Sequence, residues 1–357
     1  MRTYRRLLDE AGLSGLSYPV EFGGQGYPER YEQLFIEVRN EFQPPEEFGL
    51  AIGIGMCLPT IRDHGSDELR RRFLAPGLRG DELWCQLYSE PSAGSDLAAL
   101  STRAELDGDE WIVTGQKVWT SGAEIADVAI LLARTDVDAP KHAGITMFVL
   151  DMRQAGVEVR PLVQMTGAAE FNEVFLDGAR IPRDHLVGEV NGGWRLAVAL
   201  MAHERAAIGR GHKSTTGRRS GRYPLPLDDL VGRARAQARL DDPMVRQDLA
   251  RVHSGERIID WLNRRSAHPS ITKLWRSRQG RLAAQVAHEL GGPNAAAWPA
   301  ENDLDDYFAY HVLNCRGMSI GGGTDEIQRN TLGERVLGLP REPGPPRDTP
   351  FRDIPRN

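Results

Sequence analysis

The stretch from Leu87 to Ala98, which reads LYSEPSAGSDLA, contains residue types that form turns and bind polar groups. Its Ser, Gly and Pro residues give a turn-rich backbone with many free N–H, C=O and hydroxyl groups. Such a backbone can follow the edge of a planar, polar ligand. The same pattern also describes an ordinary surface loop, so its meaning depends on the rest of the chain.

Two later stretches accompany this one, namely Lys117-Val-Trp-Thr-Ser-Gly122 and Gly321-Gly-Gly-Thr-Asp-Glu-Ile-Gln-Arg-Asn330. In this order and at about this spacing, the three stretches resemble motifs of the acyl-CoA dehydrogenase family of flavoproteins. The resemblance extends from Gly12 to Arg341. It implies an oxidoreductase of fatty acid or lipid metabolism, of the β-oxidation type, that uses FAD to convert an acyl-CoA to the 2,3-enoyl-CoA.

The composition sets limits on the class of protein. The chain has 357 residues, of which 40% are hydrophobic and 26% are charged, which predicts two or three globular domains. Three widely separated cysteines predict neither disulfides nor a metal site, and suit a reducing cytoplasm. A net charge of -6 argues against a nucleic-acid partner. The basic run 210–222 is interpreted first as a solvated loop and second as a phosphate contact, and no membrane segment or secretory signal is predicted.

The hydrophobic pattern predicts an α+β fold that is mostly helical. Residues 1–86 have apolar residues at helical spacing, and residues 87–187 contain short alternating runs that predict a compact antiparallel β domain, a barrel or sandwich. Helical spacing returns in residues 188–341, which predicts a four-helix bundle, and residues 342–357 form a tail. The family usually has a further helical stretch before Met1, which leaves open whether the N-terminus is complete.

The resemblance implies roles for individual residues, with the flavin between the β domain and the bundle. Tyr88 and Ser89 would donate hydrogen bonds to the ring, Trp119 would cover it, and Ser121 would bind near its hydride-accepting nitrogen. Ser95 would lie by the phosphopantetheine arm of the substrate. For Trp119 the alternative interpretation is a core aromatic residue.

At the start of a predicted helix, Thr324 and Glu326 match positions that reach the cofactor of the same or a neighbouring subunit. Their alternative role is helix capping, and the two roles are compatible. Asp325 is expected to face the N–H groups of that helix or the cofactor.

The catalytic base departs from the commonest family pattern. Many members have the glutamate at the position of Gly322, and glycine cannot accept a proton. A minority place the base on an earlier helix directly before an arginine, and this chain has Glu204 and Arg205 there. The resemblance therefore implies that Glu204 is the base, with Arg205 at the substrate site and the Gly322 N–H bound to the thioester oxygen. The alternative for Glu204 is a solvated helix face.

At the adenine end of the cofactor, the residues of this chain match the family pattern less well. The family's Arg-x-x-Phe-Gly stretch is replaced by Arg239-Leu-Asp-Asp-Pro-Met-Val-Arg-Gln247, in which Arg246 could substitute. His288 and Gly292 lie in a stretch similar to a later cofactor-contacting Gly-Gly turn.

The implied partners are an acyl-CoA substrate, an electron-transfer flavoprotein and further copies of the chain in a homodimer or homotetramer. Two alternatives stay open. The chain could be a flavin-poor, non-catalytic subunit of a heterotetramer with a paralogous chain. It could also be an acyl-carrier-protein dehydrogenase or oxidase. The sequence does not identify the acyl group, although glycines at 321 and 322 favour branched or ring-bearing chains.

Overall fold

A computed structural model describes residues 2–39, 41–42, 45, 48–209, 224–296 and 303–355. The chain forms two compact units. Unit 1 comprises Met1–Val163, Ala169–Ser214 and Gly344–Asn357, and unit 2 comprises Gln164–Ala168 and Thr215–Pro343. The expected order of helical, β and helical segments is confirmed. The basic run 210–222 lies outside the described residues.

Unit 1 begins with short helices and helical turns. They are α1 (Arg2–Glu10), η1 (Val20–Phe22), α2 (Arg30–Arg39), α3 (Phe48–Ile52), the π-helical turn η2 (Gly53–Cys57), α4 (Leu58–His64) and α5 (Asp67–Arg79). The bounds of α5 follow from its sequence. The Ser66 hydroxyl accepts the Leu69 N–H, acidic residues follow in the first turn, and Gly80 ends the helix in the left-handed region.

The following segment forms an eight-stranded sheet. Its strands are β1 (Trp84–Leu87), β2 (Arg103–Asp107), β3 (Glu110–Ser121), β4 (Val128–Arg134), β5 (Ile145–Asp151), β6 (Val157–Leu162), β7 (Phe171–Pro182) and β8 (Leu186–Val187), with the short turn η3 (Leu97–Ala99) before β2. Their order is β6-β7-β3-β2-β4-β5-β8, and β1 pairs with β4. Most pairs are antiparallel as expected, but β1 runs parallel to β4 because the long connection 88–127 returns the chain to the same end of the sheet.

Strand β4 is buried on both faces. Val128, Ile130 and Leu132 pack with the N-terminal helices, whereas Ala129 and Leu131 face a second core shared with β3 and β7. A strand with both faces covered has no polar alternation, which explains its continuous apolar sequence.

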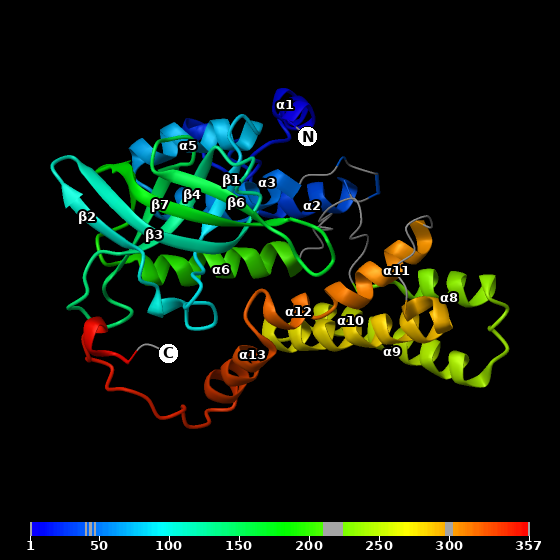
Figure 1. Ribbon diagram of the computed structural model, residues 1–357. Helices are drawn as coiled ribbons and strands as arrows, with labels where there is room; N and C mark the ends of the chain where they lie inside the picture. The colour runs from blue at the N-terminus through cyan, green and yellow to red at the C-terminus, as the bar shows by residue number, and fades with distance from the viewer. Residues whose placement is uncertain are drawn as a thin grey trace. The chain divides into compact units, whose positions relative to one another are not determined.

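The sheet is followed by α6 (Gly193–Gly209), which packs along it (Figure 1). Leu196, Ala197 and Leu200 join the core that contains the β4 and β5 side chains. A Cβ on Gly193 would lie 2.7 Å from the Thr146 carbonyl carbon, so glycine permits the close approach of α6 to β5.

Unit 2 is helical. Its elements are α8 (Leu227–Ala236), α9 (Pro243–Arg264), α10 (Pro269–Gly291), the turn η4 (Gly292–Ala296), α11 (Asp303–Asn314), α12 (Gly317–Ile320), α13 (Asp325–Thr331) and the π-helical turn η5 (Leu332–Val336). Pro243 and Pro269 stand in the first turn of α9 and α10, where a missing N–H costs no hydrogen bond. None of the described helices is long and apolar enough to cross a membrane.

The C-terminal residues return to the β domain of unit 1 and include the turn η6 (Phe351–Asp353). The Phe351 N–H donates to the Ala139 carbonyl at 3.0 Å, and the Arg352 N–H donates to the Val137 carbonyl at 3.1 Å. Phe351 is buried, and the Arg134 guanidinium lies 3.7 Å from its ring centroid. This part of the expected tail is therefore packed.

Candidate functional site

An irregularity in β3 presents Trp119 to solvent. The pairing of β3 with β7 shifts between Lys117 and Thr120, as in a β-bulge. Trp119 has a φ of 63°, which is rare and strained for a bulky residue and is often found at functional sites. As a result Lys117 and Val118 are both buried, while Trp119 is 56% exposed and lies edge-on to Phe171.

The loop after β1 lies beside this bulge. The Val118 N–H donates to the Ser89 carbonyl at 2.9 Å, and a tight turn follows in which Glu90 and Ala93 exchange backbone hydrogen bonds. Two segments in direct contact thus carry Tyr88, Ser89, Trp119 and Ser121, although the two motifs lie about thirty residues apart in the sequence. The hydroxyls of Ser89 and Ser121 are half-buried and hydrogen-bond to no residue within the described part of the chain.

A buried ion pair lies beneath the two segments. The Lys117 Nζ lies 2.8 Å from the Glu90 Oε1, and the two side chains are 0% and 3% exposed. Burial lowers the pKa of Lys117, and the nearby Glu90 carboxylate opposes that shift. Burial alone would raise the pKa of Glu90, but Lys117 and hydrogen bonds from Ser101 and Thr102 outweigh it, so the pKa is lowered. Each group of the pair thus opposes the effect of burial on the pKa of the other.

Arg134 binds the C-terminal end of the loop that follows β1. Its guanidinium donates to the Ala98 carbonyl at 2.7 Å and to the Leu100 carbonyl at 3.3 Å. Burial lowers the pKa of Arg134 to about 10, so it keeps its charge near neutral pH. Ser95 lies on the exposed part of the loop between these two anchors.

Glu204 and Arg205 lie in α6, but their side chains are outside the described part of the structure. His203, which precedes Glu204, links this turn of α6 to α4. Its Nε2 donates to the Asp63 carboxylate of α4 at 3.2 Å. Arg62 binds the same carboxylate at 2.7 Å. Burial raises the pKa of Asp63, but the hydrogen bonds from His203 and Arg62 outweigh it and hold the pKa well below its usual range.

In unit 2, the glycine-rich turn before α13 is held by a side chain of that helix. Gly322 and Gly323 have φ values of 65° and 83°, and the Gln328 Nε2 donates to the Gly322 carbonyl at 2.9 Å. The Gly322 N–H makes no hydrogen bond to a described residue. The Thr324 hydroxyl accepts the Ile327 N–H, which confirms its helix-capping role.

Asp325 does not face the N–H groups of its own helix. Its carboxylate binds the Lys273 Nζ at 2.9 Å and the Arg281 guanidinium at 3.1 Å, both on α10. Burial would raise its pKa, but these two bonds outweigh it, so the pKa is lowered. Its neighbour Glu326 is 76% exposed and binds Arg329 one turn later. Asp325 therefore anchors α13 to α10, while Glu326 faces solvent in unit 2.

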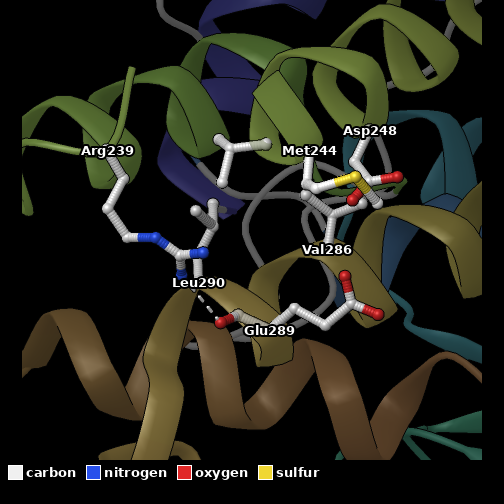
Figure 2. A pocket seen from close by; sticks show the side chains of 7 residues that line it. Arg239, Met244, Asp248, Val286, Glu289 and Leu290 are labelled. Atoms are coloured by element: carbon white, nitrogen blue, oxygen red, sulfur yellow. Dashed lines mark hydrogen bonds between the residues drawn. The ribbon is translucent and has the colours of Figure 1, made fainter. Parts of the chain in front are cut away.

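The three residues proposed for the adenine end all lie in unit 2. Arg246 and His288 are exposed on α9 and α10, and Gly292 follows α10. A nearby cavity of about 110 Å³ contains none of the three (Figure 2). It is lined by Arg239, Met244, Val245, Asp248, Val286, Glu289 and Leu290.

This cavity is a poor diphosphate site. Small-molecule pockets usually measure roughly 300 to 1,000 Å³. The Arg239 guanidinium is already bound to the Glu289 carbonyl at 3.1 Å, as Figure 2 shows, and to the Asp242 carboxylate at 3.0 Å. The carboxylates of Asp248 and Glu289 at its wall would repel an anion.

Comparison with known proteins decides the family. Acyl-CoA dehydrogenase IpdE1 of Mycobacterium tuberculosis is 38% identical over 351 residues, which cover 96% of this chain and 88% of that protein. This chain belongs to the acyl-CoA dehydrogenase family. Family profiles for the acyl-CoA dehydrogenase N-terminal, middle and C-terminal domains match residues 2–81, 85–179 and 191–337. The fold and the family expected from the three motifs are thereby confirmed.

Two solved structures are similar along most of their length. The Tcur3481-Tcur3483 steroid ACAD has a TM-score of 0.79 and 29% identity, over 96% of this chain and 89% of that one. The ChsE4-ChsE5 complex from Mycobacterium tuberculosis has a TM-score of 0.76 and 29% identity, over 95% of this chain and 90% of that one.

The family generally binds FAD, and unit 1 has groups that fit a flavin. The indole of Trp119 offers an exposed aromatic face, and the free hydroxyls of Ser89 and Ser121 lie on the two flanking segments. Partly exposed hydroxyls without a partner can donate to the polar edge of a ring, whereas the aromatic face can contact its plane.

The residues that support these groups, namely Glu90, Lys117 and Arg134, were not expected from the sequence, and in unit 2 Asp325 was expected in a different role. One signal was available for Lys117. Strand side chains alternate, so Lys117 shares the face of Trp111 and Val113, which point inward in β3. A lysine on an inward face requires a buried anion, and Glu90 belongs to a motif that was already singled out.

Proposed function

We propose that this acyl-CoA dehydrogenase, with FAD bound, oxidises the CoA thioester of a ring-bearing or branched acyl chain to the 2,3-enoyl-CoA, and that Glu204 removes the α-proton. When bound, the flavin supplies an acceptor for the hydride that leaves the β-carbon. The chain's own residues would bind the thioester, exclude water and hold the proton from the α-carbon.

The observation that carries this proposal is the backbone at Gly322. A φ of 65° is a conformation that glycine adopts without strain and glutamate rarely adopts. The backbone of this turn is therefore unfavourable for a glutamate at the commonest family position, which supports a base on another element. Glu204 lies in α6, whose adjacent residue His203 is bound to Asp63, so its backbone has a fixed support.

The proposed substrate class rests on the same turn and on a relative. Gly321 and Gly322 have no side chains to narrow an acyl slot, and the Tcur3481-Tcur3483 steroid ACAD is similar over 96% of this chain. Mixing the purified holoenzyme with straight, branched and ring-bearing acyl-CoAs tests the proposal through bleaching of the oxidised flavin band. We expect the fastest bleaching with ring-bearing thioesters. Bleaching by straight-chain thioesters alone contradicts the substrate class, and no bleaching with any thioester contradicts the activity.

A second candidate function is that of one subunit in a heteromeric acyl-CoA dehydrogenase whose partner chain completes the cofactor site. It is favoured by Arg239, which begins the stretch that replaces Arg-x-x-Phe-Gly and whose guanidinium is engaged by Asp242 and the Glu289 carbonyl. The similar ChsE4-ChsE5 structure is a complex of two chains. Measuring the FAD content and the mass of the chain alone and after coexpression with a paralogous subunit separates the candidates. Stoichiometric FAD in a homo-oligomer excludes the second one.

A separate measurement, the rate of flavin reoxidation, identifies the electron acceptor. Electron-transfer flavoprotein is the acceptor that the family resemblance implies. An acyl-carrier-protein oxidase would instead be reoxidised rapidly by oxygen without that partner. The rate of flavin reoxidation in air, with and without an electron-transfer flavoprotein, distinguishes these outcomes.

A further inference from the structure

We propose that the buried Lys117–Glu90 ion pair is a positioning device, which holds the Tyr88–Ser89 segment against the bulge that presents Trp119 and Ser121. The pair itself would touch neither flavin nor substrate. The inference rests on the proposed function in one respect, namely that this surface contacts FAD.

Each partner is bound to backbone as well as to the other charge. The Lys117 Nζ also donates to the Tyr88 carbonyl at 3.1 Å. The Glu90 carboxylate accepts the backbone N–H groups of Ser101 at 2.7 Å and Thr102 at 2.9 Å, and the Ser101 hydroxyl at 3.0 Å. One ion pair therefore joins the loop after β1, the residues just before β2 and the bulged part of β3.

The contact continues through the next residue. The Tyr88 carbonyl binds the Lys117 side chain, and the Ser89 carbonyl binds the Val118 N–H. Consecutive carbonyls of one segment are thus fixed by consecutive residues of the other. The register shift that turns Trp119 outward begins at Lys117, so the same residue anchors both segments.

Stability alone is a weak reason for such a pair. Moving two charges out of water is costly, and a buried ion pair can often be replaced by apolar residues without loss of stability. An apolar pair could fill the same space, but it could not bind the Tyr88 carbonyl or the Ser101 and Thr102 N–H groups. What the ion pair adds is a directional restraint on the loop.

The electrostatic surroundings agree with this role. The groups that act on Lys117 are Glu90, at 2.8 Å, and Arg134. Arg134 is fixed on the carbonyls of Ala98 and Leu100 at the far end of the loop. The loop is therefore restrained at both ends by buried cations, with its exposed middle part left free for a ligand.

The test compares the double variant Lys117→Met/Glu90→Gln with the matched control Lys141→Met. The Gln retains one acceptor oxygen, for the N–H of either Ser101 or Thr102, and the Met replaces the lysine stem without charge. Lys141 pairs with Asp96 on the exposed part of the same loop, and its removal leaves the buried pair intact. The measurements are thermal unfolding, FAD titration of the apo-protein by flavin fluorescence, and amide hydrogen exchange of residues 88–93 without flavin.

We expect the double variant to unfold within a few degrees of the wild type, because removing both charges removes the cost of burying them together with their attraction. Amide exchange in residues 88–93 should be faster, and FAD affinity should fall by about tenfold or more, since binding must then order the loop. The control should match the wild type in all three measurements. Wild-type FAD affinity and wild-type exchange in the double variant overturn the proposal.

Other outcomes are equally decisive. If the double variant does not fold, Glu90→Gln alone retains the shape and removes the charge, and unchanged exchange and FAD affinity in that variant also overturn the proposal. If the wild type binds no FAD, the proposed function fails, while faster exchange in the double variant still supports the positioning role. If exchange is unchanged although the wild type binds FAD, the positioning role fails and the proposed function stands.

Discussion

Replacing Asp325 with Asn should destabilise the helical unit markedly, although this residue was expected to face the N–H groups of its own helix or the cofactor. The substitution retains one acceptor oxygen but removes the negative charge that lies between Lys273 and Arg281. The Asp325 side chain is 7% exposed, whereas its partners are 17% and 32% exposed. Breaking a fully buried ion pair costs about 3–5 kcal/mol. Since both cations can reach water here, we expect a smaller loss in the free energy of unfolding, about 2 kcal/mol.

Thermal unfolding of the apo-protein measures this loss. For a domain of this size, 2 kcal/mol corresponds to a fall in Tm of roughly 4–8 °C. The matched control is Glu326→Gln on the same turn, where a 76% exposed carboxylate should contribute less than about 1 kcal/mol. Equal Tm values for the two variants would refute the role assigned to Asp325.

The difference should also depend on pH. The pKa of Asp325 is lowered in the folded protein, so its stabilisation is complete above the unfolded-state pKa of about 3.9 and is lost as the pH falls through the folded value. The Tm difference between wild type and Asp325→Asn should therefore stay constant from pH 7 to about pH 5 and shrink below about pH 4. A difference that grows on acidification would contradict this assignment.

Three further substitutions test the site and the C-terminal contact. Glu204→Gln should slow flavin reduction by roughly two to four powers of ten in stopped-flow measurements while the substrate still perturbs the flavin spectrum, and a wild-type rate would exclude Glu204 as the base. Ser121→Ala should weaken flavin reduction and leave the Tm unchanged, because one hydroxyl is lost without a change in packing; unchanged reduction kinetics would place the flavin elsewhere. Phe351→Ala should lower the free energy of unfolding by about 2 kcal/mol through loss of its contact with Arg134, measured against the exposed control Phe42→Ala, and equal values would show that the contact contributes little.

Several features of this protein could be predicted from the sequence because their causes are local. Alternation in the segments that begin at Val157 and Phe171 predicted strands, and helical spacing near Leu196 predicted α6. Thr324 was recognised as a possible helix cap from its position before two acidic residues, and its hydroxyl does cap α13. These properties depend on residues only a few positions apart, so a single sequence contains the information.

The supporting contacts of the site were decided by tertiary structure. Lys117 pairs with Glu90, which lies 27 residues earlier in the chain, and Asp325 pairs with Lys273, which lies 52 residues earlier. The side chain of Trp119 turns outward because β3 shifts its register against β7, a strand that begins some fifty residues later. A change of register by one residue moves every side chain to the opposite face of a strand, and strand identity does not fix that register. The sequence alone therefore determined which segments carry the chemistry, whereas sheet register and helix packing determined which charges hold those segments in place.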